Sequence, residues 1–397
     1  MDLHSPLPLL GGLTPTQFMR RHWQKRPLLV RQAVPGMREA RPPEGAQPGS
    51  PAGGGGPMGP PLARGELFAL AAQDGVESRL IRRSAQGWSL RHGPFARRAL
   101  PPLQQPGWTL LVQGVDLHHE GAHALMRRFD FLPDARLDDL MISYASDTGG
   151  VGAHYDSYDV FLLQAQGRRR WSIGRQKNLD LQPGVPLKVL QHFEPEQSFE
   201  LEAGDMLYLP PRYAHDGVAV GDDCMTCSIG LRSPAAAPLG ADLLARIAEA
   251  QADELDDAPK VHYRDAAQPA VDHPAAMPSA LQAFARQAVE AALRDPDAVD
   301  RALGESMTEP KSNVWFEPGA LPERLEGVRL DRRTRMLYDL RHLYINGESF
   351  RAGGRDATLM RQLADQRALG ARELARASDD AVALLGDWCE AGWAHAA

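Results

Sequence analysis

The chain has 397 residues, with 44 Lys and Arg against 51 Asp and Glu, so its formal net charge at pH 7 is −7. This length predicts two or three domains, and a hydrophobic content of 43% is ample for packed cores. Three Cys exclude a disulfide-stapled scaffold and fit a reducing compartment. No apolar run reaches the roughly 18 residues of a membrane span, and the Pro-rich start lacks the basic leader of a signal peptide. We therefore expect a cytoplasmic protein that does not span a membrane.

The N-terminal part predicts a short ordered segment followed by a loop. Thr14 is suited to cap a helix with Pro15 in its first turn, and a strand is expected at residues 27–30. From residue 42 to residue 61, 14 of 20 residues are Gly or Pro. Such a segment buries too little to offset its ordering entropy, so we interpret it as a disordered insertion rather than a rigid Pro-rich ligand.

The next part changes from mixed elements to a long β-rich block. A helix is expected at residues 65–74, then short strands at residues 79–83, 88–91 and 108–114, and a helix at 116–131. Between Asp139 and Leu231 many short apolar-alternating runs are separated by Gly, Pro and Asp. This pattern predicts an antiparallel β-sandwich or barrel.

After Pro234 the pattern becomes helical. Apolar residues recur at helical spacing over residues 241–255 and 278–293, and these helices are expected to pack on another domain or a second subunit. A hairpin with an Asn346-Gly347 turn and three short helices then predict a winged-helix-like module. Residues 331–397 carry 10 Arg and 10 acidic residues, which argues against DNA binding.

Two histidines and an aspartate in the β-rich block have the spacing of a metal site. His154 and Asp156 lie two residues apart, so on a strand they point to the same face. His215 follows a predicted strand at residues 206–209, and a barrel can bring it beside the other two. Two His and one carboxylate on one side of an octahedron form the facial triad of non-haem Fe(II) oxygenases. The alternative is two unrelated surface histidines and a solvated aspartate.

A hairpin is expected directly after this motif. The strand that follows His154 should run to about Gln164, turn at residues 165–167 and return over residues 168–173. Trp171 and Ile173 are apolar, so their face of the returning strand is the inner one.

Alternation places Arg169 on that inner face and Arg168 and Arg170 on the outer one. A buried guanidinium needs an anionic partner, and no acidic residue is near Arg169 in the sequence. The dicarboxylate 2-oxoglutarate would supply one, with its keto-acid end on the metal and its far carboxylate on Arg169. The alternative is that Arg169 pairs with a distant Asp or Glu.

Two further features are weaker. Cys224 and Cys227 form a CxxC pair, but on a strand this spacing sends the thiols to opposite faces, so two ordinary buried residues are the better interpretation. Six arginines lie between Arg79 and Arg98; they can face RNA, although a solvated basic face is more common.

Three segments together resemble the bacterial JmjC-type ribosomal oxygenases of the cupin superfamily: residues 152–161, 167–171 and 204–215. Residues 18–29 resemble the N-terminal part of that family, and the loop at 42–61 departs from its pattern. The resemblance covers most of the chain and implies an α+β protein with a double-stranded β-helix (jelly-roll) core. It implies a catalytic domain at 1–233, a helical dimerisation domain at 234–310 and a winged-helix-like domain at 311–397.

The resemblance also implies a chemistry. Fe(II) would be held by His154, Asp156 and His215, with 2-oxoglutarate and O₂ as co-substrates. Arg169 would pair with the 2-oxoglutarate carboxylate, and the Ser143 hydroxyl would lie near the co-substrate. The implied reaction hydroxylates the β-carbon of an arginine in large-subunit ribosomal protein sixteen, and the implied assembly is a homodimer.

Substrate residues and the exact activity stay open at this level. Asp147 and Asp159 flank the ligand strand and either receive the substrate guanidinium or are surface charges. The chain is alternatively a histidine hydroxylase or a demethylase of another protein, or a non-catalytic cupin sensor or scaffold.

Overall fold

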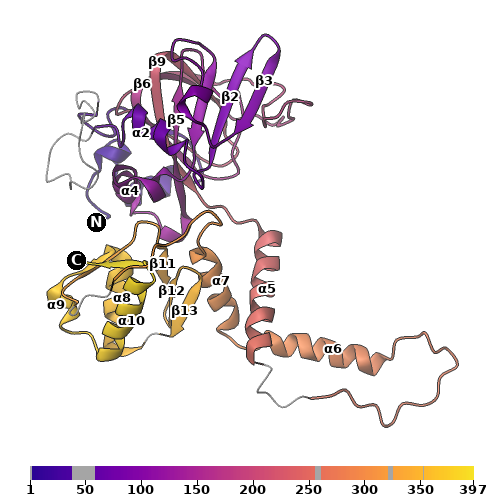
Figure 1. The fold of residues 1–397 in the computed structure, drawn as a ribbon. Coiled ribbons are helices and arrows are strands. Elements are labelled where there is room, and N and C mark those ends of the chain that lie inside the picture. The colour runs from indigo at the N-terminus through magenta and orange to yellow at the C-terminus, as the bar shows by residue number, and fades with distance from the viewer. Residues whose placement is uncertain (1, 38–58, 255–260, 321–324, 352) are drawn as a thin grey trace. The chain divides into compact units, whose positions relative to one another are not determined.

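The computed structural model describes residues 2–37, 59–254, 261–320, 325–351 and 353–397. The chain divides into two compact units, Met1–Ser233 and Pro234–Ala397, which run from indigo to yellow in Figure 1. Of the Gly/Pro-rich segment at 42–61, only residues 59–61 lie within the described ranges. Within those ranges, no helix has both the length and the apolar character needed to cross a membrane.

The first unit begins with short elements that the sequence predicts well. Its helices are α1 (Pro15–Arg21) and α2 (Arg64–Leu70), and the short strand β1 (Leu28–Val30) lies between them. Thr14 caps α1 as expected: its hydroxyl accepts a hydrogen bond from the Gln17 N–H at 3.1 Å, and the Gln17 side chain accepts one from the Thr14 N–H at 3.1 Å. This reciprocal capping box fixes where the helix starts.

The expected helix at 116–131 is broken in the structure. Two short helices, α3 (Val115–His118) and α4 (Glu120–Met126), are separated by His119, which is extended with φ −137° and ψ 126°. The His119 ring accepts a hydrogen bond from the Gly121 N–H at 3.1 Å and so caps α4. Single-turn 3₁₀ helices occur here and elsewhere in the unit, at Pro8–Leu10, Arg97–Ala99, Arg127–Phe129 and Asp134–Arg136.

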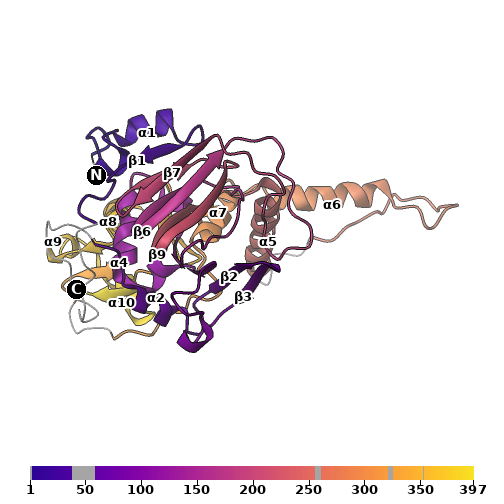
Figure 2. The same ribbon diagram turned by 90° about the horizontal axis from the view of Figure 1, so that it is seen from above.

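One antiparallel sheet of nine strands organises the unit. Its strands after β1 are β2 (Ser78–Ser84), β3 (Gly87–His92), β4 (Trp108–Val112), β5 (Leu137–Ala145), β6 (Val160–Gly174), β7 (Gln197–Glu202), β8 (Met206–Leu209) and β9 (Ala214–Leu231). The order is β1-β8-β6-β9-β5-β4-β2-β3, and β7 also pairs with β6. Figure 2 shows β7, β6 and β9 side by side. The two long strands β6 and β9 therefore join the halves of a β-sandwich, which agrees with the antiparallel β architecture expected from the sequence.

The prediction of a hairpin turn at residues 165–167 is wrong. Strand β6 runs without a break from Val160 to Gly174, and both of its halves pair with β9. The register shifts on either side of Gln166, and Gly167 has a left-handed φ of +66°. Because a bulge bends a strand without reversing it, the Gly that suggested a turn instead curves β6 around the sandwich. The inward direction expected for Arg169 is nevertheless observed.

The sheet has two buried faces with different neighbours. Phe161 and Tyr208 lie in the large core that also contains Phe18 of α1. On the other face, Trp171 and Ile173 form a smaller inner cluster together with Val160, Leu162, Leu201, Leu207 and Leu209. Side chains alternate along β6, so this one strand contributes residues to the large core on one face and to the inner cluster on the other.

The second unit contains three helices followed by a small α/β module. The helices are α5 (Ala236–Glu254), α6 (Ser279–Ala292) and α7 (Ala298–Thr308). Two three-stranded sheets follow, β11 (Met336–Tyr338) with β12 (His342–Ile345) and β13 (Glu348–Arg351), and β10 (Val328–Leu330) with β14 (Ala368–Leu369) and β15 (Ala394–Ala396). The module is completed by α8 (Gly354–Gln366), α9 (Ala371–Leu374) and α10 (Asp379–Glu390).

Several elements of this unit were missed by pattern analysis. Helix α7 and the sheet of β10, β14 and β15 were not expected. The strands of this sheet are short and pair with residues far away in the sequence, such as Val328 with Ala396, so they leave almost no local signal. Gly304 of α7 lies against the Tyr344 ring of β12, so α7 packs onto the hairpin. The boundary expected between residues 310 and 311, which would separate a dimerisation domain from a winged-helix-like domain, stays a prediction.

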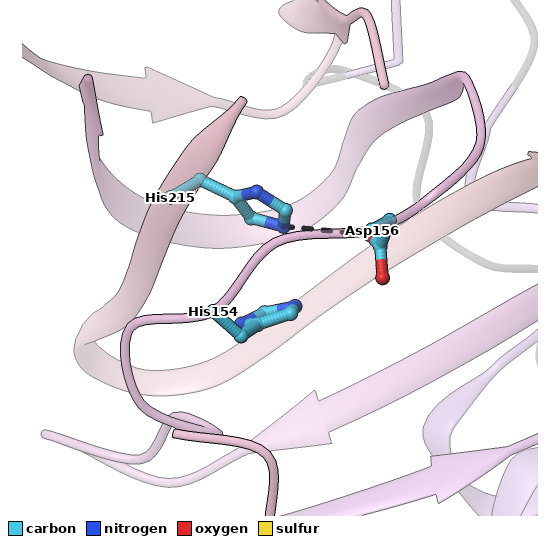
Figure 3. Close-up of side chains that lie close together, drawn as sticks. All are labelled: His154, Asp156 and His215. Carbon is cyan, nitrogen blue, oxygen red and sulfur yellow. Dashed lines mark ion pairs between the residues drawn. The ribbon is translucent and has the colours of Figure 1, made fainter. Parts of the chain in front are cut away.

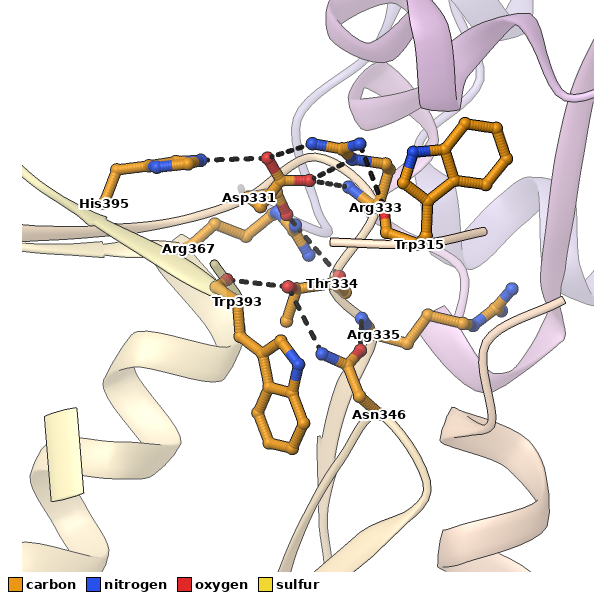
Figure 4. A network of polar contacts seen from close by, with 9 residues as sticks. All are labelled: Trp315, Asp331, Arg333, Thr334, Arg335, Asn346, Arg367, Trp393 and His395. Carbon is orange, nitrogen blue, oxygen red and sulfur yellow. Dashed lines mark hydrogen bonds and ion pairs between the residues drawn. The ribbon is translucent and has the colours of Figure 1, made fainter. Parts of the chain in front are cut away.

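A polar network around Asp331 ties the end of β10 to β15 (Figure 4). The Asp331 side chain, only 5% exposed, accepts hydrogen bonds from the Arg333 guanidinium at 2.8 Å and from His395 at 2.9 Å. Arg367 donates to the main-chain oxygens of Asp331 and Thr334, at 2.6 and 3.0 Å. Burial works to raise the pKa of Asp331, but the bonds from Arg333 and His395 outweigh it and hold the pKa well below its usual value.

Asp331→Asn is expected to lower the stability of this unit by about 1–3 kcal/mol at neutral pH, because the Arg333 guanidinium and the His395 ring lose a charged acceptor. Since the pKa of Asp331 is depressed in the folded state, its contribution is complete above the unfolded-state pKa of about 3.9 and is lost as the pH falls below that value. Calorimetry of the full chain between about pH 3 and pH 7 measures this. The difference between wild type and variant should shrink in acid.

The matched control is Asp387→Asn, which changes an exposed aspartate of α10. It should unfold like the wild type at every pH. Equal unfolding of the Asp331 and Asp387 variants would contradict a stabilising role for the network.

Candidate metal centre

His154 and His215 are brought together by the main chain. They form an antiparallel pair in which the N–H of each donates to the carbonyl of the other, at 2.9 and 2.8 Å. His215 is the second residue of β9, and it lies opposite Ile173 at the end of β6. The ladder continues where the Arg212 N–H donates to the Asp156 carbonyl at 2.7 Å. Main-chain pairing therefore closes the gap of 61 residues that separates the two histidines in the sequence.

The three side chains of the sequence motif converge (Figure 3). One nitrogen or oxygen from each of His154, Asp156 and His215 lies within 4.8 Å of the others. The His215 Nε2 lies 3.7 Å from the Asp156 Oδ2, and the two imidazole centroids are 4.2 Å apart. A single ion of about 2.0–2.2 Å bond length can be reached from all three donors after small side-chain adjustments. The alternative of scattered surface groups is thereby excluded.

In both imidazoles the Nδ1 atom is hydrogen-bonded to a main-chain carbonyl, which leaves Nε2 for a metal ion. The Nδ1 of His154 lies 2.8 Å from the Gly152 carbonyl, and the Nδ1 of His215 lies 2.9 Å from the Tyr213 carbonyl. Each Nδ1–H donates to a carbonyl in this arrangement, so Nε2 keeps its lone pair. Burial, together with the neighbouring His154, lowers the pKa of His215 to about 4. The imidazole is therefore neutral at physiological pH, as a metal ligand must be.

Arg169 lies beside Trp171 and Gly217 in the buried interior of the sandwich, which we call the chamber, and two of its donors have no acceptor among the described residues. The residue is 3% exposed, and its Nη1 donates to the Gly217 carbonyl at 3.3 Å. Its Nε and Nη2 have no hydrogen-bond partner, and it forms no ion pair with the described residues. The alternative of a distant Asp or Glu partner is therefore not observed. An unpaired buried guanidinium is costly, so the chamber is suited to an anion.

Trp171 connects this guanidinium to the metal centre. The Arg169 guanidinium lies 5.7 Å from the Trp171 ring centroid, and the Trp171 ring lies 5.8 Å from that of His215. The ring also lies against Gly217, where a Cβ would stand 2.6 Å from its carbons. Gly217 is therefore required for Trp171 to occupy the chamber wall.

Ser143 lies on the wall of the same chamber. It is 4% exposed and shares a face of β5 with Ala145, which contacts Ala219. Ala219 is directly opposite Arg169 in the sheet. The Ser143 hydroxyl donates to the Thr226 carbonyl at 3.4 Å. A second hydrogen-bonding group near the guanidinium is thus available to a ligand.

The structure also shows polar residues of this chamber that sequence analysis missed. Gln164 and Thr226 are both buried and face each other across β6 and β9, with a 3.0 Å hydrogen bond from the Thr226 hydroxyl to the Gln164 side chain. Their signal in the sequence was weak: one polar residue at an alternate position of an otherwise apolar strand. Asp216, next to His215, was also missed; burial raises its pKa.

The two candidate substrate carboxylates differ in their surroundings. Asp147 is half-buried, and its Oδ1 accepts a hydrogen bond from the Gly221 N–H at 2.8 Å, the only side-chain partner it has among the described residues. Asp159 is fully buried: its Oδ1 accepts from Tyr208 at 2.6 Å, and its Oδ2 accepts from Gln24 and Arg136 at 3.1 and 3.3 Å. Internal partners occupy both oxygens, so the expectation that Asp159 receives a substrate guanidinium is corrected to a structural role.

The two cysteines of the CxxC pair behave as expected. Both are buried free thiols, with Cys227 in the large core and Cys224 in the small cluster with Ala145 and Ala219 on the opposite face. They cannot ligate one ion together.

A double-stranded β-sandwich with two histidines, one aspartate and a buried arginine defines a JmjC-type centre. A sequence model of the JmjC domain matches residues 124–239, and a model of the ROXA-like winged helix matches residues 291–395. The expected winged-helix module is thereby confirmed.

Known proteins extend the similarity. The chain is 38% identical over 218 residues to the ribosomal protein uL16 3-hydroxylase of Escherichia coli (strain K12), covering 55% of this chain and 52% of that protein. It is 33% identical over 226 residues to a probable ribosomal oxygenase of Haemophilus influenzae, covering 56% and 50%. These sequence matches span about half the length of the curated relatives.

Solved structures match over nearly the whole chain. The crystal structure of the Escherichia coli ribosomal oxygenase YcfD has a TM-score of 0.74 at 30% identity, covering 96% of this chain and 98% of that one. A structure of that oxygenase with cobalt and 2-oxoglutarate has a TM-score of 0.75 at 29% identity and the same coverage. The chain therefore belongs to the bacterial JmjC ribosomal oxygenases and is a homologue of the uL16 3-hydroxylase.

Proposed function

We propose that the protein is an Fe(II)- and 2-oxoglutarate-dependent hydroxylase that acts on the β-carbon of an arginine in ribosomal protein uL16. The observation that carries this proposal is the buried Arg169, with two unsatisfied donors, in the same chamber as the two histidines and the aspartate. The name of the 38% identical relative supports the substrate, and the cobalt and 2-oxoglutarate complex of the related oxygenase supports the cofactors.

The donor set fits the metal. His154 and His215 offer Nε2 atoms and Asp156 a carboxylate, which suits Fe(II) with positions left open. When bound, Fe(II) would use O₂ and the electrons released by oxidative decarboxylation of 2-oxoglutarate to hydroxylate an unactivated C–H bond.

The protein's own residues would position the co-substrate and exclude water. Arg169 would hold the distal carboxylate of 2-oxoglutarate, with the Ser143 hydroxyl nearby as a second hydrogen-bonding group. Trp171 and the apolar inner cluster would keep the chamber dry, which strengthens this ion pair. The keto-acid end would then be directed towards the histidine pair.

Asp147 is the better candidate for the substrate arginine. Its Oδ2 has no hydrogen bond among the described residues, while the bond from Gly221 fixes its position. A free carboxylate oxygen on the loop that precedes the metal ligands can accept a guanidinium N–H.

We further propose that the helices of residues 234–310 form a homodimer contact. No described residue of α6 is buried within the chain, and apolar side chains such as Val289 and Leu244 are 64% and 55% exposed. Helices with an uncovered apolar stripe favour association. Burial of this stripe by the same helices of a second copy would satisfy it symmetrically.

Asp156→Ala should abolish the hydroxylation of a uL16 peptide and the formation of succinate, because one of three metal donors is lost. Mass spectrometry of the peptide, with a gain of one oxygen as the readout, also distinguishes hydroxylation from demethylation. His192→Ala, which changes an exposed histidine, is the control and should retain wild-type turnover. Wild-type protein that makes no more succinate than Asp156→Ala would leave the non-catalytic sensor as the correct function.

Arg169→Ala should raise the apparent KM for 2-oxoglutarate about 10–100-fold, since a charge-assisted contact contributes about 1.5–3 kcal/mol. Binding of the metal should be unchanged. Arg168→Ala is the matched control, because Arg168 faces outward and pairs with Glu200 at 2.6 Å. Similar KM values for the two variants would remove Arg169 from the co-substrate site.

Val289→Glu should shift the full-length protein from dimer to monomer in sedimentation velocity, because a charge would enter the proposed contact. Val382→Glu introduces the same change at an exposed valine of α10 and should leave the dimer intact. A wild-type protein that sediments as a monomer would contradict the dimer.

A further inference from the structure

The β2–β3 hairpin and the segment after it form a strongly basic surface. Arg82, Arg83 and Arg91 of the hairpin and Arg97 and Arg98 of the following 3₁₀ turn are all exposed. Residues 78–115 contain no Asp or Glu. We call these five arginines the basic hairpin surface. The hairpin is the outer edge of the sheet, because β3 pairs only with β2.

The guanidinium groups of this surface are available to an external anion. None of the five forms an ion pair with a described residue. Three of them lie over aromatic rings instead, with distances of 5.4, 5.5 and 5.2 Å to the centroids of Trp88, Phe95 and Phe68. Stacking restricts a guanidinium without neutralising it, so less entropy is lost when it binds a phosphate.

This surface lies beside the metal centre. The Trp88 ring lies against Gly152, two residues before His154, where a Cβ would stand 3.0 Å from the ring. A partner on the hairpin would therefore be adjacent to a substrate in the chamber.

A second cationic feature adjoins the centre. A cavity of about 320 Å³ is lined by Lys25, Arg175, Lys177 and Arg212, and no Asp or Glu contributes to its wall. The Arg212 N–H holds the Asp156 carbonyl at 2.7 Å. The surroundings of the centre are thus positive, although the chain as a whole is negative.

The distribution of charge explains what this surface attracts. Residues 1–233 carry 25 Lys and Arg against 24 Asp and Glu, whereas residues 234–397 carry 19 against 27. The negative charge of the chain therefore belongs to the second unit, and the centre has a positive border. A polyanion that accompanies the substrate protein would be attracted there.

We propose that the basic hairpin surface binds the phosphate backbone of RNA and so docks the enzyme on a substrate protein that is already associated with RNA. The choice of RNA rests on the proposed function, because a ribosomal protein is the substrate. The binding itself rests on five exposed arginines that form no ion pair with a described residue, in a stretch (residues 78–115) that contains no Asp or Glu. This combination matches contacts to a phosphate backbone.

The test measures RNA binding by fluorescence anisotropy, using the full-length protein and a labelled single-stranded RNA of about 20 nucleotides. Arg82→Gln/Arg91→Gln/Arg98→Gln removes three contacts and should weaken binding roughly tenfold or more. The slope of log K against log salt should fall by about 2, since each lost phosphate contact on a single strand contributes about 0.7.

The control is Arg355→Gln/Arg372→Gln/Arg376→Gln, which removes the same charge from exposed arginines of the second unit. It should bind RNA like the wild type. Hydroxylation of a free uL16 peptide should be unchanged in the hairpin variant, because the peptide carries no RNA.

Three outcomes would overturn the proposal: no RNA binding by the wild type, equal loss in both triple variants, or equally tight binding of an acidic peptide of the same charge. The anisotropy needs no turnover. Failure of RNA docking is therefore distinguishable from failure of the hydroxylase function, which the Asp156→Ala comparison tests separately.

Discussion

The two hydrogen bonds between the main chains of His154 and His215 determine the rest of the centre. They bring the two imidazole centroids to 4.2 Å from each other, and the neighbouring bond from the Arg212 N–H holds the Asp156 main chain beside them. Main-chain pairing is rigid because β9 is already paired along β6, so the donors are arranged before any ion arrives. Such preorganisation is what a metal centre needs to keep open coordination positions.

The chamber next to this pair contains the positive charge of Arg169, which no described residue neutralises. Arg169 is buried with unsatisfied donors, while Asp159 is buried with every oxygen satisfied by Tyr208, Gln24 and Arg136. The two charged groups therefore differ in their hydrogen-bond partners, although both are buried. A buried polar group without partners is costly in a folded protein, and function is the usual reason for its retention.

Charge is also distributed unevenly outside the chamber. The acidic excess of the chain lies in residues 234–397, and the border of the centre is basic. Residues 331–397 of the winged-helix module carry no net charge, so they contribute neither to the acidic excess nor to the basic border.

The sequence by itself determined the fold class, the metal-binding motif and the inward direction of Arg169, because strand alternation and the spacing of His154 and Asp156 are local properties. It could not determine that residues 165–167 bend rather than turn, since a bulge and a hairpin use the same glycine. Nor could it separate Asp147 from Asp159 or find Gln164 and Thr226, because satisfaction of a buried group depends on partners far away in the chain. Only the tertiary structure decided those points, through contacts between residues far apart in the sequence, such as Tyr208 with Asp159 and Thr226 with Gln164.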